Sequence, residues 1–258
     1  MVLTQVQTSG GALSLPDAQA ALRCLCGGAP VRLLHLDAES LDAAWAEVAA
    51  VGAALGATAK GEALAGWCRA RVDACSAAAR GRGPPRRVAV VQWAAPLYAA
   101  GGWVPQLVRA AGGEDACDVP PGGASLQLTP TQLAAAAPDV LLLAICGVGV
   151  EAAAAEAPAL AEALGQDAWA ALPAVRRGAV VAADAVRLFS RAGPALADTA
   201  ELLLEVFWPE AQPPGHHGTA WRYVDAGAEA AKRPPPPVPD AADACAAETA
   251  PSRELAYV

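Results

Sequence analysis

The segment from Asp139 to Cys146 constrains the fold of this chain more than any other. After its first residue it reads VLLLAIC, which is apolar without a break instead of alternating between apolar and polar residues. Such a run is typical of a parallel strand that is covered by helices on both faces of its sheet. Because parallel strands are joined by crossover connections, usually helical, the segment predicts an α/β architecture.

Composition and charge exclude several classes of protein. The longest apolar run, Val140 to Val150, stops at Glu151 and is far shorter than the roughly 20 residues that span a bilayer, so we expect no membrane insertion. No basic segment followed by an apolar one comes after Met1, so the sequence contains no secretory signal and leaves the compartment open. The net charge is -8 and the 18 basic residues are scattered, which argues against nucleic-acid binding and favours a soluble protein.

The seven cysteines and three histidines do not predict a metal site. There are no paired CxxC blocks with the spacing of zinc ligands. Cys24 and Cys26 could form a redox or metal pair, but free thiols in a reducing compartment are the interpretation we favour. Cys68 and Cys75 lie two helical turns apart, and we expect them to pack on one helix face.

The first part of the chain has the order of a β-α-β unit. Val2 to Leu3 predicts a strand, Ser14 to Cys26 a helix and Val31 to Leu36 a second strand. Ser40 then caps an alanine-rich helical stretch that we expect to break near Gly56. We therefore assign residues 1–57 to a partial first lobe.

A long helix is predicted from Thr58 to Arg80. As a single helix it would extend about 35 Å at 1.5 Å per residue, which is enough to connect two lobes. Gly81 to Pro85 end it, because glycine and proline favour turns. We assign residues 58–80 to this inter-lobe helix.

A second α/β lobe is predicted for residues 81–210. Its expected elements are the strand Arg87 to Trp93, the loop Ala94 to Gly102, the helices Trp103 to Ala111 and Thr129 to Ala137, the strand Asp139 to Cys146, the helix Ala153 to Leu164, the strand Ala179 to Ala183 and the helix Pro194 to Phe207. The remaining residues, 211–258, contain proline runs and few large apolar residues. We expect them to form a disordered tail.

Five blocks of the sequence resemble one protein family. They are VQWAAPLYAAGGWVP at Val91 to Pro105, AGGE at Ala111 to Glu114, APDV at Ala137 to Val140, FSRAGP at Phe189 to Pro194 and VLTQ at Val2 to Gln5. In this order they are similar to the cobalamin and iron-chelate substrate-binding proteins of ABC importers, a periplasmic-binding family with a helical inter-lobe linker. The blocks cover most of residues 2–210.

The resemblance implies two Rossmann-like lobes joined by a long α-helix, with a ligand held between them. It also implies that the first lobe is incomplete and the chain truncated at its N-terminus, because the family's opening strands would precede Val2. Strand ends and the loops after them would face the cleft. The residues that we expect to bind the ligand are Gln5, Gln7, Trp93, Tyr98, Trp103 and Arg191.

The aromatic candidates would offer flat faces to a corrin ring or chelate, and Arg191 would offer a forked donor. Each also has a structural explanation, since the aromatic rings could pack in the core, Arg191 could be a solvated charge, and the glutamines could form a polar turn. Gln92, Ala95 and Gly102 depart from the family's cleft loop, which weakens any assignment of one ligand.

The predicted function is non-enzymatic binding of a cobalamin-like or iron-chelate ligand, with no resident cofactor. The chain contains no GxSxG, no phosphate loop with lysine and no carboxylate or histidine cluster near the expected cleft. Family members dock on a permease through one glutamate per lobe. Thr131 stands at the second-lobe position, which argues against permease docking. The alternative is a structural or interaction remnant of the fold, without ligand or transport role.

Overall fold

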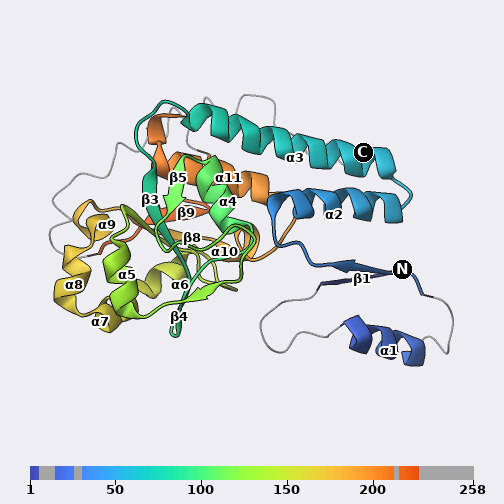
Figure 1. Cartoon of the computed structure of the whole chain (residues 1–258), viewed down its shortest axis with the longest axis horizontal. Helices are drawn as coiled ribbons and strands as arrows, with labels where there is room; N and C mark the ends of the chain where they lie inside the picture. Colours follow the sequence, from blue (N-terminus) through green and yellow to red (C-terminus); the bar gives the residue numbers. More distant parts are fainter. Residues whose placement is uncertain (6–14, 26–30, 212–214, 227–258) are drawn as a thin grey trace.

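The computed structural model describes residues 1–5, 15–25, 31–211 and 215–226, and its architecture is mixed α/β as predicted (Figure 1). The first lobe begins with β1 (Val2–Gln5), α1 (Leu15–Leu25) and β2 (Leu33–Leu36). β1 and β2 pair in parallel, with Val2 opposite Leu33. The predicted β-α-β unit is therefore present.

Two long helices follow and lie side by side (Figure 1). They are α2 (Leu41–Ala54) and α3 (Thr58–Ala79). Ser40 caps α2, because its side chain accepts a hydrogen bond from the Ala43 backbone N–H at 3.2 Å. The helices approach closely where two glycines face each other, since a Cβ on Gly52 would lie 2.6 Å from the Gly61 Cα.

The second lobe contains one seven-stranded sheet. Its strands are β3 (Arg86–Ala94), β4 (Leu97–Ala99), β5 (Gly113–Asp115), β6 (Leu126–Gln127), β7 (Val140–Leu143), β8 (Val180–Ala183) and β9 (Trp221–Tyr223). They are ordered β6-β4-β3-β7-β8-β9, with β5 paired to β3. The pairs β3–β5, β3–β7 and β7–β8 are parallel, and β4, β6 and β9 are antiparallel to their neighbours.

Helices cover both faces of this sheet. They are α4 (Val104–Ala110), α5 (Pro130–Ala136), α6 (Val150–Ala155), α7 (Ala157–Leu164), α8 (Gln166–Ala171), α9 (Pro173–Arg176), α10 (Ala185–Leu188) and α11 (Ala195–Phe207), followed by the 3-10 turn Pro209–Ala211. Figure 1 places α3, α4 and α11 on one side and α5 to α9 on the other. Successive β7 residues alternate between two cores, because Leu142 packs in one and Leu141 and Leu143 in the other.

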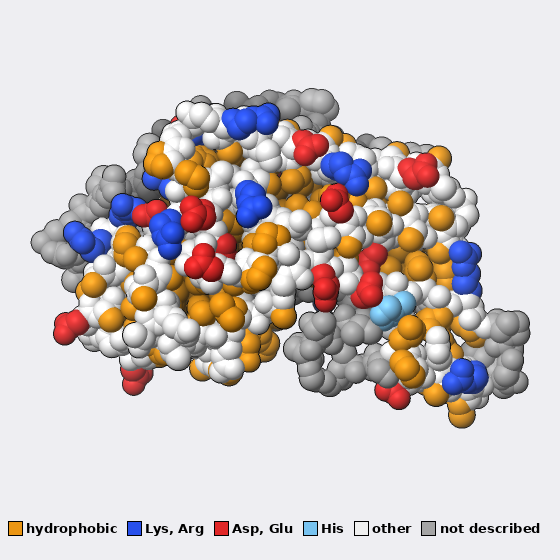
Figure 2. All heavy atoms as spheres, in the orientation of Figure 1, with side chains coloured by type: hydrophobic (Ala, Val, Ile, Leu, Met, Phe, Trp, Pro, Cys, Tyr) orange, Lys and Arg blue, Asp and Glu red, His pale blue; other side chains and the backbone are white. Residues whose placement is uncertain are grey.

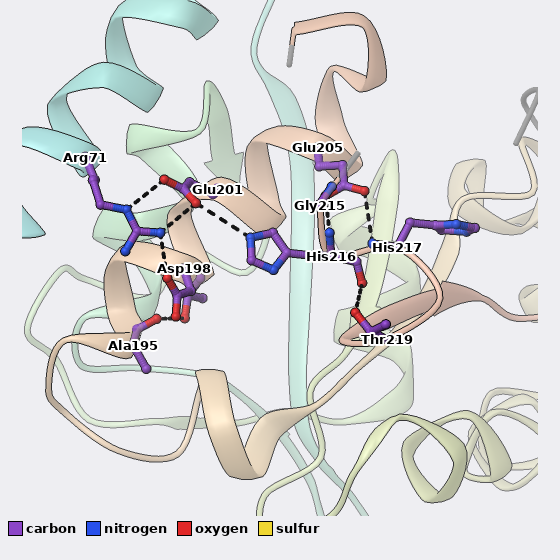
Figure 3. A network of polar contacts seen from close by, with 10 residues as sticks. Arg71, Ala195, Asp198, Glu201, Glu205, Gly215, His216, His217 and Thr219 are labelled. Carbon is purple, nitrogen blue, oxygen red and sulfur yellow. Dashed lines mark hydrogen bonds and ion pairs between the residues drawn. The ribbon is translucent and has the colours of Figure 1, made fainter. Parts of the chain in front are cut away.

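The long helix α3 belongs to the core of the second lobe as well as to the α2 pair. Its Cys68 and Cys75 are buried, as predicted, and pack in the same cluster as α11. Arg71 bonds Asp198 at 2.5 Å and both carboxylate oxygens of Glu201 at 2.6 and 2.8 Å (Figure 3). These contacts fix α3 against α11.

The expectation of a disordered tail from residue 211 is wrong for residues 215–226. The buried carboxylate of Glu205 accepts hydrogen bonds from the backbone N–H groups of Gly215, His216 and His217 (Figure 3). β9 then adds to the sheet beside β8, and Trp221 is buried. The composition of the tail did not predict β9, because a single strand that adds to an existing sheet needs few apolar residues. Residues 212–214 and 227–258 lie outside the described residues.

Two further expectations are corrected within the second lobe. The expected loop at residues 94–102 contains β4, which forms a hairpin with β3 and places Trp93 opposite Tyr98. The helix expected from Ala153 to Leu164 is divided into α6 and α7. Pro158 lies at the start of α7, and a proline there cannot donate to the preceding turn.

Among the described residues, no helix combines the length and the apolar character needed to cross a membrane.

Candidate functional site

A cleft of about 500 Å³ lies between the first lobe and the second. Its lining comes from distant parts of the chain: His35, Asp37, Ala38, Glu39, Gln92, Trp93, Gly101, Gly102, Trp103, Val104, Gly123, Ala124, Ser125, Cys146, Phe189 and Ser190. Acidic side chains and a histidine gather on the surface where the two lobes meet (Figure 2). The volume is within the range of small-molecule sites.

The cleft lies where the parallel strands end. His35 is the next-to-last residue of β2, Gln92 and Trp93 are near the end of β3, and Cys146 follows β7. The Cys146 backbone N–H donates to the Gln92 carbonyl at 2.9 Å, so the ends of β3 and β7 are held together. Ligands of open α/β sheets bind outside the carboxyl ends of the strands, and this cleft has that position.

Two tryptophans and the buried Phe189 provide the aromatic surface of the cleft. Trp93 is 46% exposed, which is unusual for so large an apolar side chain. Trp103 is half-buried where α4 begins, and its indole Nε1 is buried without a hydrogen-bond partner. The faces of both rings suit a flat ligand.

The first lobe contributes a histidine and two carboxylates. The His35 Nδ1 is also buried without a hydrogen-bond partner. His35 and Trp103 thus account for two of the four buried side-chain polar atoms that are unpaired in the described part of the chain. Buried polar groups are normally paired, and an unpaired one is often explained by a ligand or water that belongs there.

The loop between β2 and α2 is held in place from both lobes. Glu47 on α2 accepts hydrogen bonds from the backbone N–H groups of Asp37 and Ala38. The Leu41 N–H donates 2.8 Å to the Gln106 side-chain oxygen on α4. These contacts fix the acidic side of the cleft against the second lobe without a ligand.

The floor of the cleft requires glycine at one position. A Cβ on Gly101 would lie 2.4 Å from the Gly123 carbonyl oxygen and 2.6 Å from the Ala124 carbonyl carbon. Gly101 therefore allows the segment before α4 to touch the segment at residues 123–125. Both segments line the cleft.

The structure brings together some of the residues predicted from sequence and not others. Trp93 and Trp103 line the cleft. Tyr98 is not part of the lining, and its hydroxyl donates 3.1 Å to the Gln127 side-chain oxygen. Arg191 is exposed and also outside the lining. Gln5 ends β1, with its side chain outside the described residues, as is all of Gln7.

Sequence analysis missed His35, Asp37, Glu39, Cys146 and Ser190. The position of Cys146 after the most apolar strand was a usable signal, since ligands gather at such strand ends. No comparable signal marked His35, because a lone histidine at the end of a strand is more often structural.

A second cavity, of about 370 Å³, lies between α2, α3 and the segment Ala192 to Pro194. Small and aliphatic side chains form most of its wall, with Glu47 and Lys60 as the charged residues. It contains no aromatic ring in its lining and lies away from the ends of β3 and β7. The first cleft is therefore the better candidate for a specific site.

Residues 10–186 match the family described as "Periplasmic binding protein", and the chain belongs to this family. No curated protein matches the chain.

Solved structures agree with this assignment. The chain is 25% identical to the periplasmic heme-binding protein RhuT from Roseiflexus sp. RS-1, with a TM-score of 0.63 over 81% of this chain and 76% of that one. It is 26% identical to the periplasmic heme-binding protein BhuT, solved with two hemes, with a TM-score of 0.59 over 81% and 76%.

The vitamin B12 binding protein BtuF of Vibrio cholerae shares the fold at 20% identity, with a TM-score of 0.55 over 82% and 75%. The predicted family and fold are confirmed, and the chain is homologous to substrate-binding proteins of ABC importers.

Proposed function

We propose that this protein binds a corrinoid, a cobalamin-like ligand, in the cleft between its lobes, without catalysing a reaction. The observation that carries the proposal is the combination of two tryptophan surfaces with an acidic, cation-free lining. Asp37 and Glu39 line the cleft, and among the described residues no lysine or arginine does.

Charge distinguishes the ligands suggested by the family. Heme carries two propionates, and burying them beside two carboxylates would be unfavourable without a paired cation. A corrin ring carries neutral amides at its edge, which can bond Gln92 and Ser125 in the lining. The amide-rich ligand therefore fits this lining better than heme, although the relatives RhuT and BhuT are heme-binding proteins.

A preformed site supports binding without a large hinge motion. Bending α3 would break backbone hydrogen bonds of a continuous helix and would disturb the Arg71 contacts with α11. We propose that the relative position of the two lobes does not change when the ligand binds.

The test is calorimetric titration with dicyanocobinamide, cobalamin, hemin and a ferric hydroxamate. We expect the cobinamide to bind and the Trp93→Ala change to weaken its affinity about tenfold, because aromatic stacking is worth about 1 kcal/mol beyond burial. Tyr98→Ala and Arg191→Ala are the controls, since both residues lie outside the lining, and each should change affinity less than about twofold.

Tighter binding of hemin than of any corrinoid would contradict the corrinoid assignment. Loss of binding in Tyr98→Ala or Arg191→Ala but not in Trp93→Ala would place the site around Tyr98 and Arg191 instead of in this cleft. If none of the four compounds binds, the alternative of a fold without ligand or transport role replaces the proposal.

Permease docking is a separate question. Thr131 is exposed near the start of α5, so the position predicted for the docking glutamate is accessible but uncharged. We propose that the chain docks weakly or not at all on a permease. The measurement is co-purification with a permease of the family. We expect little permease with the wild-type protein and more with the Thr131→Glu variant.

A further inference from the structure

One imidazole and one thiol, each from a different lobe, line the same cleft as Asp37 and Glu39. His35 comes from β2 of the first lobe, and Cys146 follows β7 of the second. Cys146 is a free, half-buried thiol. The other two histidines, His216 and His217, lie beside Glu205 and outside the lining.

These two donors are too few to hold a bare metal ion. The described residues contain no group of three or more histidine, cysteine, aspartate or glutamate side chains arranged for a metal, and structural or catalytic zinc sites use at least three protein ligands. A metal inside a macrocycle already has four equatorial nitrogens and needs one or two axial ligands. The imidazole of His35 and the thiol of Cys146 could meet that need.

The surroundings of both side chains leave their donor atoms available. The His35 Nδ1 is buried and has no hydrogen-bond partner in the described residues, so a metal in the cleft would have to bind through Nε2. The Ser190 hydroxyl donates to the Cys146 sulfur at 3.5 Å. A hydrogen bond to the sulfur tunes the properties of a metal bound to it.

We propose that His35 and Cys146 are axial ligands to the metal of a tetrapyrrole-type ring held in the cleft, one from each lobe. The proposal rests on the proposed function and deepens it, since it requires a ligand whose axial positions can be exchanged. It distinguishes metallo-macrocycles from ferric hydroxamates, whose donor atoms already occupy the metal.

The exchange is balanced without any redox partner. The His35 Nε2 lone pair forms a bond to the metal as one axial water leaves. The Cys146 sulfur forms the other bond as the second water leaves, and its S–H bond breaks with release of the proton to solvent. The oxidation state of the metal does not change.

The experiment compares two cobinamides that differ in their axial ligands. Diaquocobinamide has two exchangeable waters, whereas both positions of dicyanocobinamide are blocked by cyanide. We expect the wild-type protein to bind the diaquo form at least about tenfold more tightly, because loss of even an outer-shell partner of a metal costs tenfold or more. Its visible spectrum should shift on binding, and the spectrum of the dicyano form should not.

Variants of His35 and Cys146 then test the two proposed bonds to the metal separately. His35→Gln and Cys146→Ser should each reduce affinity for the diaquo form about tenfold more than affinity for dicyanocobinamide, and each should change the spectrum of the diaquo complex. His217→Gln and Cys24→Ser are matched controls, because Cys24 is exposed on α1 and neither residue lines the cleft. Both controls should retain the wild-type spectrum.

The outcomes separate this proposal from the function on which it rests. If the two cobinamides bind equally and Trp93→Ala weakens both, the corrinoid site stands and axial ligation is overturned. If the spectral shift is lost in Cys24→Ser or His217→Gln, ligation occurs at the surface and the proposal is overturned. If neither cobinamide binds, the proposed function has failed and axial ligation fails with it.

Discussion

The two lobes differ in how completely they bury their strands. All four residues of β7 and all four of β8 are buried, whereas all four of β2 are only half-buried. The first 57 residues contribute only Ala18, Ala38, Ala44 and Trp45 to the buried apolar residues of the described chain. They also contain Met1, Leu3, Leu25 and Leu55, which are exposed apolar side chains.

This difference has a physical reason. A parallel strand is stable when neighbours pair with both of its edges and helices cover both of its faces. β7 has β3 and β8 beside it and helices on either side. β1 and β2 form a two-stranded sheet in the described residues. We therefore expect the second lobe to be the more stable of the two, with α2 of the first lobe attached to it mainly through α3.

The largest expected effect is on fragments. A fragment of residues 58–226 should unfold cooperatively, because it keeps α3, β9 and all buried members of the two core clusters except Ala38, Ala44 and Trp45. A fragment of residues 81–210 should not, since it lacks Cys68, Val72, Cys75 and Trp221, which are all buried. Urea denaturation followed by circular dichroism is the measurement. A cooperative transition of equal midpoint in both fragments would show that α3 and β9 are not part of the stable unit.

Two leucine-to-alanine changes, one in a strand of each lobe, compare how much a strand side chain contributes to stability in the two lobes. Leu142→Ala in β7 removes a fully buried side chain and should lower the free energy of unfolding by about 2–5 kcal/mol. Leu34→Ala in β2 removes a half-buried one and should cost about 1 kcal/mol. Amide hydrogen exchange should likewise be slower in β7 than in β2. Equal costs and equal protection would mean that the first lobe is as well packed as the second.

Acid should weaken the contact that joins α3 to the second lobe. Burial alone would raise the pKa of the Glu201 carboxyl, but hydrogen bonds from His216 and Arg71 lower this pKa to about 2. The folded pKa is below the ordinary value of 4.5. The stability contributed by this carboxylate is therefore present above pH 4.5 and is lost as the pH falls toward 2.

Glu201→Gln should thus be less stable than wild type at pH 7, and the difference should shrink between pH 4.5 and 2. Glu114→Gln is the control, because Glu114 belongs to an exposed pair with Arg87 and such pairs contribute little. The measurement is the urea midpoint as a function of pH. A difference that does not depend on pH would contradict the role of the charge.

The smallest effect compares one helix cap from each lobe. Ser40 caps α2, and Thr129 caps α5 within a capping box in which Gln132 bonds back to the Thr129 backbone. Replacing either residue with alanine should cost about 1 kcal/mol. Thr129→Ala should lower the thermal midpoint of global unfolding. Ser40→Ala should mainly increase hydrogen exchange in the first turn of α2, because opening there need not unfold the second lobe.

The sequence alone was sufficient for the elements that local pattern specifies. The unbroken apolar run at Asp139 to Cys146 predicted a strand buried on both faces, and β7 has that environment. The glycine and proline residues after Arg80 predicted the end of the long helix, because they disfavour helix at the positions where they stand. Pro158 could have predicted the break between α6 and α7 by the same reasoning.

The tertiary structure decided which side chains share a cleft. Trp93 and Tyr98 are both aromatic and five residues apart, but the β3–β4 hairpin leaves Trp93 in the cleft and turns Tyr98 toward Gln127. His35 and Cys146 are 111 positions apart in the numbering and line one cavity. Local pattern sets helices and strands because backbone preferences act over a few residues. A site between lobes depends on contacts between distant segments, so only the packed chain determines it.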